Sequence, residues 1–139
     1  MSGTINFAIP KGSLEKATFE ILERAYNDKK KFTEKFNLNL LNVINKKLKI
    51  KIKLKDFKYI GTYNKKKTCM ENFIISKKNQ SFDIKNKKIY FKKNEKIQTE
   101  ISNKFTILKF KSIIKATGWK LKKYWTDPRK YYVVFLLES

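Results

Sequence analysis

The stretch from Glu95 to Phe105 holds the most informative group of polar side chains in this sequence. Glu100 and Ser102 lie two positions apart in a segment expected to be extended, so their side chains share one face of a strand. A carboxylate accepts hydrogen bonds and a hydroxyl also donates them, so the pair offers two kinds of contact to a ligand. Taken alone, Glu100 is more simply explained as a surface carboxylate that compensates Lys96 or Lys104.

The residue inventory excludes several kinds of chemistry. The chain has no histidine, so serine–histidine and cysteine–histidine catalysis are impossible, and a zinc site is almost excluded. The single Cys69 cannot form an internal disulfide. We therefore expect no metal ligand in this chain.

The size and composition indicate one folded domain. The chain has 139 residues, of which 41% are hydrophobic and 14% aromatic, and this composition favours a packed core over disorder. No apolar run is long enough to cross a membrane, and the first twenty residues lack the layout of a signal peptide. The sequence predicts a cytoplasmic protein with no membrane partner.

The net charge of +22 makes nucleic acid an obvious candidate partner. Only Arg24 and Arg129 are arginines among the 34 basic residues, although specific phosphate and base recognition favours the planar arginine fork. The lysines are also spread over the whole chain. This distribution favours a solvated lysine surface with nonspecific polyanion binding.

The N-terminal third predicts a strand and two helices. Residues 5–9 form a short strand closed by Pro10-Lys11-Gly12, and Ser13 is a good N-cap for a helix over about residues 14–25. A second helix is expected from near Asp28, because apolar residues recur at intervals of four. These residues are Phe32, Phe36, Leu40, Ile44 and Leu48.

The rest of the chain alternates with a period of two, apart from one helix. Residues 50–54 fit either a strand or a loop with a turn, and strands are expected at residues 57–63, 72–76, 81–84 and 89–91. A third helix over about residues 107–117 ends at Gly118. Two final strands flank the Asp127-Pro128 turn. The predicted fold class is α+β, an antiparallel meander with flanking helices and a C-terminal β-hairpin.

From Tyr26 to the end, the order of motifs resembles the C-terminal part of the SAM-dependent histidine N-alpha-methyltransferases, the ergothioneine-pathway family. One motif alone would be weak, but several occur in the expected order over residues 26–139. They are Ala25-Tyr26-Asn27-Asp28; Phe36-Asn37-Leu38-Asn39-Leu40-Leu41 with Ile44-Asn45; Tyr63, Glu71, Ser76 and Gln80; Glu95-x-Ile97-x-Thr99-Glu100-x-Ser102-x-Lys104-Phe105; Ala116-x-Gly118-Trp119; and Trp125-Thr126-Asp127.

The resemblance implies a site for an amino acid, L-histidine or another one. In this family a Glu-x-Ser pair holds the substrate imidazole, which points to Glu100 and Ser102. The tyrosine of the Ala-Tyr-Asn-Asp motif helps to fix the substrate carboxylate, which points to Tyr26, and Phe36 lines the same pocket. Asn72 aligns where the family usually has a methionine beside the ring, which leaves open which amino acid is preferred.

The resemblance also implies a SAM-binding half that this sequence does not supply. The four glycines are not arranged to cradle a cofactor, so we expect no SAM binding by this chain alone. Residues 5–23 instead resemble the start of ATP phosphoribosyltransferase. We therefore expect a segment of residues 1–25 of that origin, joined to a recognition domain over residues 26–139 in a truncated or chimeric reading frame.

Three hypotheses about function follow. The first is an amino-acid-binding part of a histidine methyltransferase that is inactive alone and needs a SAM-binding domain in trans. The second is a basic nucleic-acid-binding protein, with Tyr59, Tyr63, Tyr90 and Phe91 stacking on bases. The third is a gene remnant without activity. The sequence does not separate the first hypothesis from the third.

Overall fold

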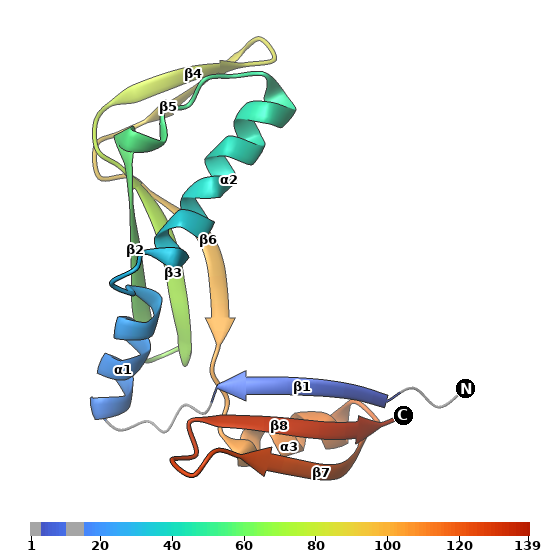
Figure 1. The fold of residues 1–139 in the computed structure, drawn as a ribbon. Helices are drawn as coiled ribbons and strands as arrows, with labels where there is room; N and C mark the ends of the chain where they lie inside the picture. The colour runs from blue at the N-terminus through green and yellow to red at the C-terminus, as the bar shows by residue number, and fades with distance from the viewer. Residues whose placement is uncertain (1–3, 11–15) are drawn as a thin grey trace.

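The computed structural model describes residues 4–10 and 16–139, with side chains from residue 19 onward (Figure 1). Lys11, Gly12 and the expected cap Ser13 lie outside the described residues. The helices and strands, in chain order, are β1 (Thr4–Pro10), α1 (Lys16–Tyr26), α2 (Phe32–Leu48), the 3-10 turn η1 (Leu54–Asp56), β2 (Phe57–Asn64), β3 (Cys69–Ser76), β4 (Gln80–Ile84), β5 (Lys87–Phe91), β6 (Lys96–Asn103), α3 (Ile107–Ala116), β7 (Lys120–Thr126) and β8 (Tyr132–Glu138).

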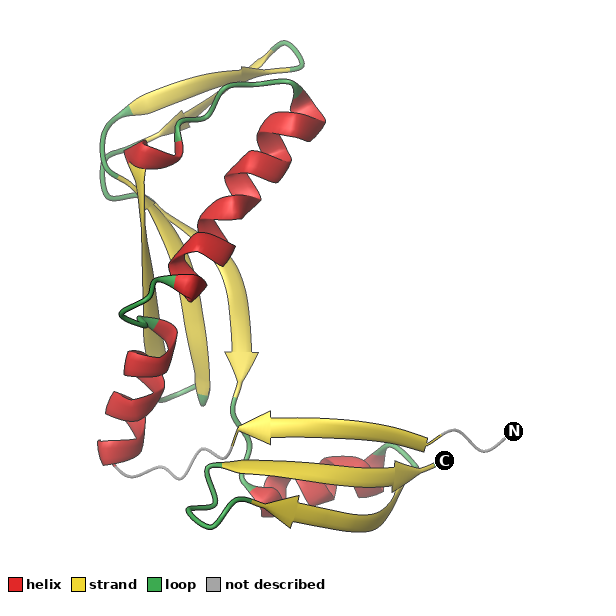
Figure 2. Cartoon of the chain, viewed as in Figure 1, coloured by secondary structure: helices red, strands yellow, loops and turns green. Residues whose placement is uncertain are grey.

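These elements form a mixed helix and sheet fold with antiparallel strands, as the α+β prediction requires (Figure 2). One group consists of the sheet β2-β3-β6, the helices α1 and α2, and the hairpin β4-β5. The other consists of the sheet β1-β8-β7 with α3 packed against it. The predicted C-terminal hairpin is thus present as β7-β8. β1 extends it into a three-stranded sheet by pairing with β8.

The predicted meander is wrong in its connectivity. β3 pairs with β2 and β6, whereas β4 and β5 pair only with each other. The cause lies at Ser76, the last residue of β3. Its backbone N–H donates to the carbonyl of Glu95 and its carbonyl accepts from Asn94, so the chain entering β6 takes the place beside β3. Residues 77–79 therefore turn out of the sheet into the β4-β5 hairpin.

Local signals place the ends of α2 and α3. α2 begins at Phe32, four residues after Asp28, because the Asp28 carboxylate accepts hydrogen bonds from the backbone N–H groups of Phe32 and Thr33. α3 begins after Thr106, whose hydroxyl accepts from the backbone N–H of Lys109. It ends before Gly118, which has the left-handed φ of 80° expected for a helix terminator.

The apolar core of the first group lies between α2 and one face of the β2-β3-β6 sheet. Leu41 of α2 packs there with Ile52, Phe57 and Ile74, each at most 7% exposed. Phe82 from the β4-β5 hairpin packs against the same cluster, which fixes the hairpin near the end of α2. Burying side chains of this size is the main stabilising contribution of such a cluster.

The second group has its own core. Ile114 of α3 packs with Val133, Phe135 and Leu137, which alternate along β8 and therefore face the helix. Within the described residues, no helix is both long and apolar enough to cross a membrane.

Candidate functional site

The helix-covered face of the β2-β3-β6 sheet changes from apolar to polar where α2 gives way to α1. Strand register sets Gly61, Asn72 and Glu100 side by side across this face, two residues along from Tyr59 on β2 and Ile74 on β3. The next row along the sheet includes Met70 and Ser102. The turn between α1 and α2 lies over this sheet, and both helices pack against it (Figure 1).

Tyr59, Asn72 and Glu100 form one hydrogen-bonded chain across the three strands. The Tyr59 hydroxyl donates to Asn72 Oδ1 at 2.6 Å, and Asn72 Nδ2 donates to Glu100 Oε2 at 3.1 Å. Asn72 is completely buried, and both ends of its amide are satisfied in this way. Burial, followed by the nearby carboxylate of Glu100, raises the pKa of Tyr59. The tyrosine therefore remains a neutral donor, and the exposed Glu100 carboxylate is held in place by Asn72.

Tyr26, Ser102 and Lys104 form a second group beside the first. The Tyr26 hydroxyl donates to Ser102 Oγ at 2.7 Å. The ammonium of Lys104 donates to Tyr26 Oη and to Ser102 Oγ, each also at 2.7 Å. Lys104 is only 3% exposed, which is rare for a charged side chain.

Asn27 and Asp28 fasten the α1–α2 turn over the sheet. Asn27 Nδ2 donates to the carbonyl of Gly61 at 2.8 Å, and its Oδ1 accepts from the Gly61 N–H at 3.0 Å. The Asn27 amide thus bonds β2 as a neighbouring strand would. Backbone N–H groups from Thr33 and Phe32 hold the pKa of the Asp28 carboxyl below its ordinary value.

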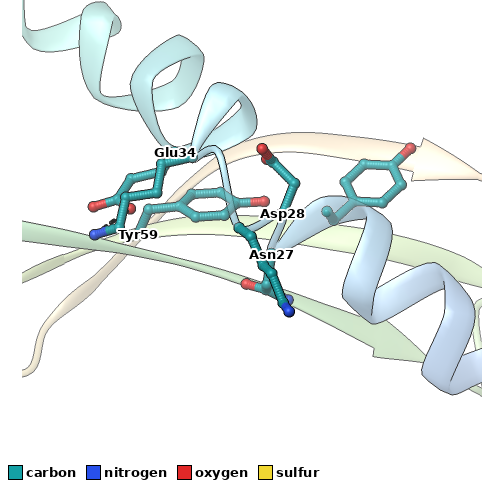
Figure 3. A pocket seen from close by; sticks show the side chains of 7 residues that line it. Asn27, Asp28, Glu34 and Tyr59 are labelled. Carbon is teal, nitrogen blue, oxygen red and sulfur yellow. Dashed lines mark ion pairs between the residues drawn. The ribbon is translucent and has the colours of Figure 1, made fainter.

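A cavity of about 230 Å³ opens at this turn (Figure 3). Its lining includes two tyrosines, two acidic residues and two lysines. The lining residues are Tyr26, Asn27, Asp28, Lys29, Lys31, Glu34 and Tyr59. The volume suits a small polar molecule, and the lining residues come from α1, the α1–α2 turn, α2 and β2.

Gly61 makes room for the two tyrosines. A Cβ at this position would lie 2.7 Å from Tyr59 Oη and 3.1 Å from Tyr26 Cβ. Any larger residue would therefore displace one of the two tyrosines. Glycine at this strand position is explained by close packing.

The structure brings together four of the five predicted site residues, namely Tyr26, Asn72, Glu100 and Ser102. Tyr26 contacts Ser102 directly, and Asn72 contacts Glu100. Phe36 does not join them. Its side chain is 73% exposed and lines a separate, more apolar depression of about 280 Å³. These contacts do not test ligand binding, so the binding roles of all five residues remain predictions.

Sequence reasoning missed two members of the cluster, Tyr59 and Lys104. Lys104 continues the alternation of Glu100 and Ser102, so its position on the same strand face was available as a signal. Among the described residues there is no group of three or more histidine, cysteine, aspartate or glutamate side chains that could hold a metal ion.

Comparison with known proteins identifies the class. The profile of the family described as histidine-specific methyltransferase, SAM-dependent, matches residues 14–139. Because this match covers most of the chain, the protein belongs to that family.

Two curated relatives agree with this assignment. An N-methyltransferase from Aspergillus flavus, imqF, is 33% identical over 114 residues, which is 81% of this chain and 31% of the relative. A histidine N-alpha-methyltransferase from Mycolicibacterium smegmatis is 28% identical over 109 residues, or 77% of this chain and 34% of the relative. The chain thus spans about a third of the length of the curated relatives it matches.

Proposed function

We propose that this chain is the amino-acid-recognition part of a SAM-dependent histidine methyltransferase and that it holds L-histidine at the Tyr26–Ser102 and Asn72–Glu100 cluster. Glu100 and Ser102 hydrogen-bond to the imidazole, and Tyr26 contributes to binding of the amino acid. The observation that carries the proposal is the convergence of four predicted side chains, from segments up to 76 residues apart, into two hydrogen-bonded groups. One of the four, Tyr26, also lines the cavity at the α1–α2 turn.

The chemistry of the cluster suits a neutral imidazole. Such a ring has one N–H donor and one nitrogen that accepts. Glu100 offers a carboxylate oxygen to the donor, and the Tyr26–Ser102 pair offers its remaining hydroxyl proton to the acceptor. A charge-assisted bond of the first kind contributes about 1.5–3 kcal/mol.

Asn72 acts in this arrangement through Glu100. Its fully buried amide contacts Tyr59 on one side and Glu100 on the other, so it orients the carboxylate. Asn72→Met should therefore weaken histidine binding by releasing Glu100, in spite of restoring the residue type usual in the family.

The described residues do not fit SAM. Binding of that cofactor in a nucleotide fold needs a glycine-rich turn between a strand and a helix. Gly61 lies within a strand under two tyrosines, and Gly118 ends α3. No glycine directly precedes α2 or α3. A SAM-binding part is therefore proposed to come from elsewhere, in trans or from further sequence, and methyl transfer requires it because donor and amine must be held in line.

Histidine binding by this chain alone should be weak. The α-amino and carboxylate groups of the substrate also face the proposed SAM-binding part, so a dissociation constant on the order of 1 mM is expected, equivalent to about −4 kcal/mol. The exposed Phe36 is available to complete the pocket when the two parts meet.

Titration calorimetry with L-histidine tests the proposal. The measurement is made at about 0.2 M salt, which screens nonspecific attraction to the lysine-rich surface. Glu100→Gln should weaken binding at least tenfold, because the charged acceptor is lost. Glu20→Gln, an exposed carboxylate on α1, is the matched control and should leave the affinity unchanged. Equal affinities for the two variants would refute the assignment of Glu100.

A further inference from the structure

Lys104 is a buried cation without a carboxylate partner. None of the ion pairs in the described part of the chain includes it, and its Nζ contacts only the hydroxyls of Tyr26 and Ser102 and the Tyr26 ring, whose centroid is 4.8 Å away. Its backbone N–H is fixed by the carbonyl of Thr68 at 2.8 Å. Burying an unpaired charge is energetically costly unless hydrogen-bond acceptors or an opposite charge compensate it.

The three groups together carry more donors than they use. An ammonium and two hydroxyls have five N–H and O–H protons. The contacts among Lys104, Tyr26 and Ser102 use three of them, whichever of the two hydroxyls donates to the other. One hydroxyl proton and one ammonium proton remain. Each hydroxyl oxygen already accepts from Lys104, so the group has a surplus of donors that an acceptor on a ligand can satisfy.

Glu100 provides the opposite polarity on the same strand. Its carboxylate only accepts, and one of its oxygens is taken by Asn72. The cluster thus presents an acceptor at Glu100 and donors at Ser102, two positions apart on one face. A ligand ring that places an N–H at the first and a lone pair at the second is complementary to both. A protonated ring has no lone pair and would bring its charge toward Lys104.

We infer that Lys104 is a positioning residue that fixes the Tyr26–Ser102 pair as hydrogen-bond donors and thereby makes the site select the neutral imidazole over the imidazolium. The inference rests on the proposed function and adds to it the protonation state of the substrate. Lys104 acts through the two hydroxyls, because its ammonium donates a hydrogen bond to each hydroxyl oxygen.

Other charged and titratable groups lie around the site and could affect the pH dependence of histidine binding. Asp28 and Lys29 face it from the α1–α2 turn, Lys31 and Glu34 from the start of α2, Tyr59 from β2, and Cys69 lies near Lys104 on β3. The ordinary titration ranges of carboxyl, phenol and ammonium groups lie outside about pH 5.5–8. The chain has no histidine, and burial raises the pKa of the Cys69 thiol. Among the ionisable groups of L-histidine, the imidazole is the one whose ordinary pKa falls in this range.

The experiment measures L-histidine affinity at pH 5.5 and pH 8 for the unsubstituted chain and for three variants. With an imidazole pKa of about 6.5, the neutral fraction rises about tenfold between the two pH values, so the unsubstituted chain should bind about ten times more tightly at pH 8. Lys104→Met should reduce this ratio to below about twofold, because the hydroxyls are then free to accept from an imidazolium. Lys104→Arg keeps the charge and donors and should retain the ratio. Lys58→Met, on the opposite face of the sheet, is the control and should also retain it.

Each outcome decides the question. If the unsubstituted chain binds L-histidine equally well at pH 8 and pH 5.5, the ligand atom that accepts from the Tyr26–Ser102 pair is not the ring nitrogen; the ligand carboxylate is one alternative. That result overturns the inference and leaves the proposed function intact. A tenfold ratio that persists in Lys104→Met also overturns it. No binding by the unsubstituted chain at any pH removes the proposed function and this inference together. Lys104→Gln, whose amide also accepts hydrogen bonds, replaces Lys104→Met if that variant fails to give a dispersed amide spectrum.

Discussion

Substitution of Gly61 by alanine should damage the site through packing alone. The added methyl would lie 2.7 Å from Tyr59 Oη and 3.1 Å from both Tyr26 Cβ and Asn72 Oδ1. Overpacking of this kind costs about 1–3 kcal/mol, and the reduced entropy of the unfolded alanine chain offsets about 0.4–1 kcal/mol of it. Displacing Tyr59 also breaks its bond to the buried Asn72, which adds about 1 kcal/mol. We expect a net loss of about 2 kcal/mol.

A double-mutant cycle with Tyr59→Phe identifies the cause. The phenylalanine lacks the oxygen that meets the new methyl group, so Gly61→Ala should cost about 1 kcal/mol less in the Tyr59→Phe background than in the unsubstituted chain. Urea unfolding measures all four free energies. For a slope of about 2 kcal/mol/M, Gly61→Ala alone shifts the midpoint by about 1 M.

Gly118→Ala supplies the control for this cycle. Gly118 has a positive φ of 80°, and no atom lies within 4 Å of the position that an added methyl group would take. Its substitution therefore strains only the backbone, at about 1–2 kcal/mol. It should not couple to Tyr59→Phe or change histidine affinity. A neutral Gly61→Ala, or a cost that is the same in both Tyr59 backgrounds, would refute the packing argument.

The remaining predictions concern substitutions of Asp28, Phe135 and Phe36. Backbone hydrogen bonds from Thr33 and Phe32 lower the pKa of Asp28 in the folded chain. The Asp28 carboxylate therefore stabilises the fold above pH 3.8, its ordinary pKa, and this stabilisation is lost as the pH falls through the lower pKa of the folded chain. The difference in thermal midpoint between the unsubstituted chain and Asp28→Ala should therefore shrink in acid. Phe135→Ala should lower the free energy of unfolding by about 3–5 kcal/mol, because Phe135 is fully buried, whereas Phe36→Ala should change it by less than about 0.5 kcal/mol. A fall in histidine affinity for Phe36→Ala at unchanged stability, measured by calorimetry, would support the predicted pocket role of that residue.

The local signals in the sequence located most elements because their causes are local. Gly118 ends α3 and the Asp127-Pro128 turn separates β7 from β8, both as predicted. The pairing of β3 with β6 was not predictable in the same way. It depends on backbone bonds from Ser76 to residues 94 and 95, and a strand's alternation of side chains does not specify which strand lies beside it.

A family motif indicates four residues that the structure brings into contact, and their roles in binding remain predictions. Glu100, Ser102, Asn72 and Tyr26 were assigned from family resemblance, and the structure places them in two contacting pairs. The alternation with Glu100 and Ser102 indicates the strand face of Lys104, but the burial that distinguishes it from the other lysines is known only from the structure. Its role depends on tertiary packing of α1 against the sheet.

The measurement that tests the central claim most directly is an amide-proton NMR titration of the chain with L-histidine at pH 8. We predict a dispersed spectrum in which the largest shifts fall at Tyr26, Glu100, Ser102 and Lys104, saturating in the millimolar range, while signals of the β1-β8-β7 sheet stay in place. A dispersed spectrum that does not respond to histidine, or shifts confined to surface residues away from this cluster, would contradict the proposed recognition of histidine.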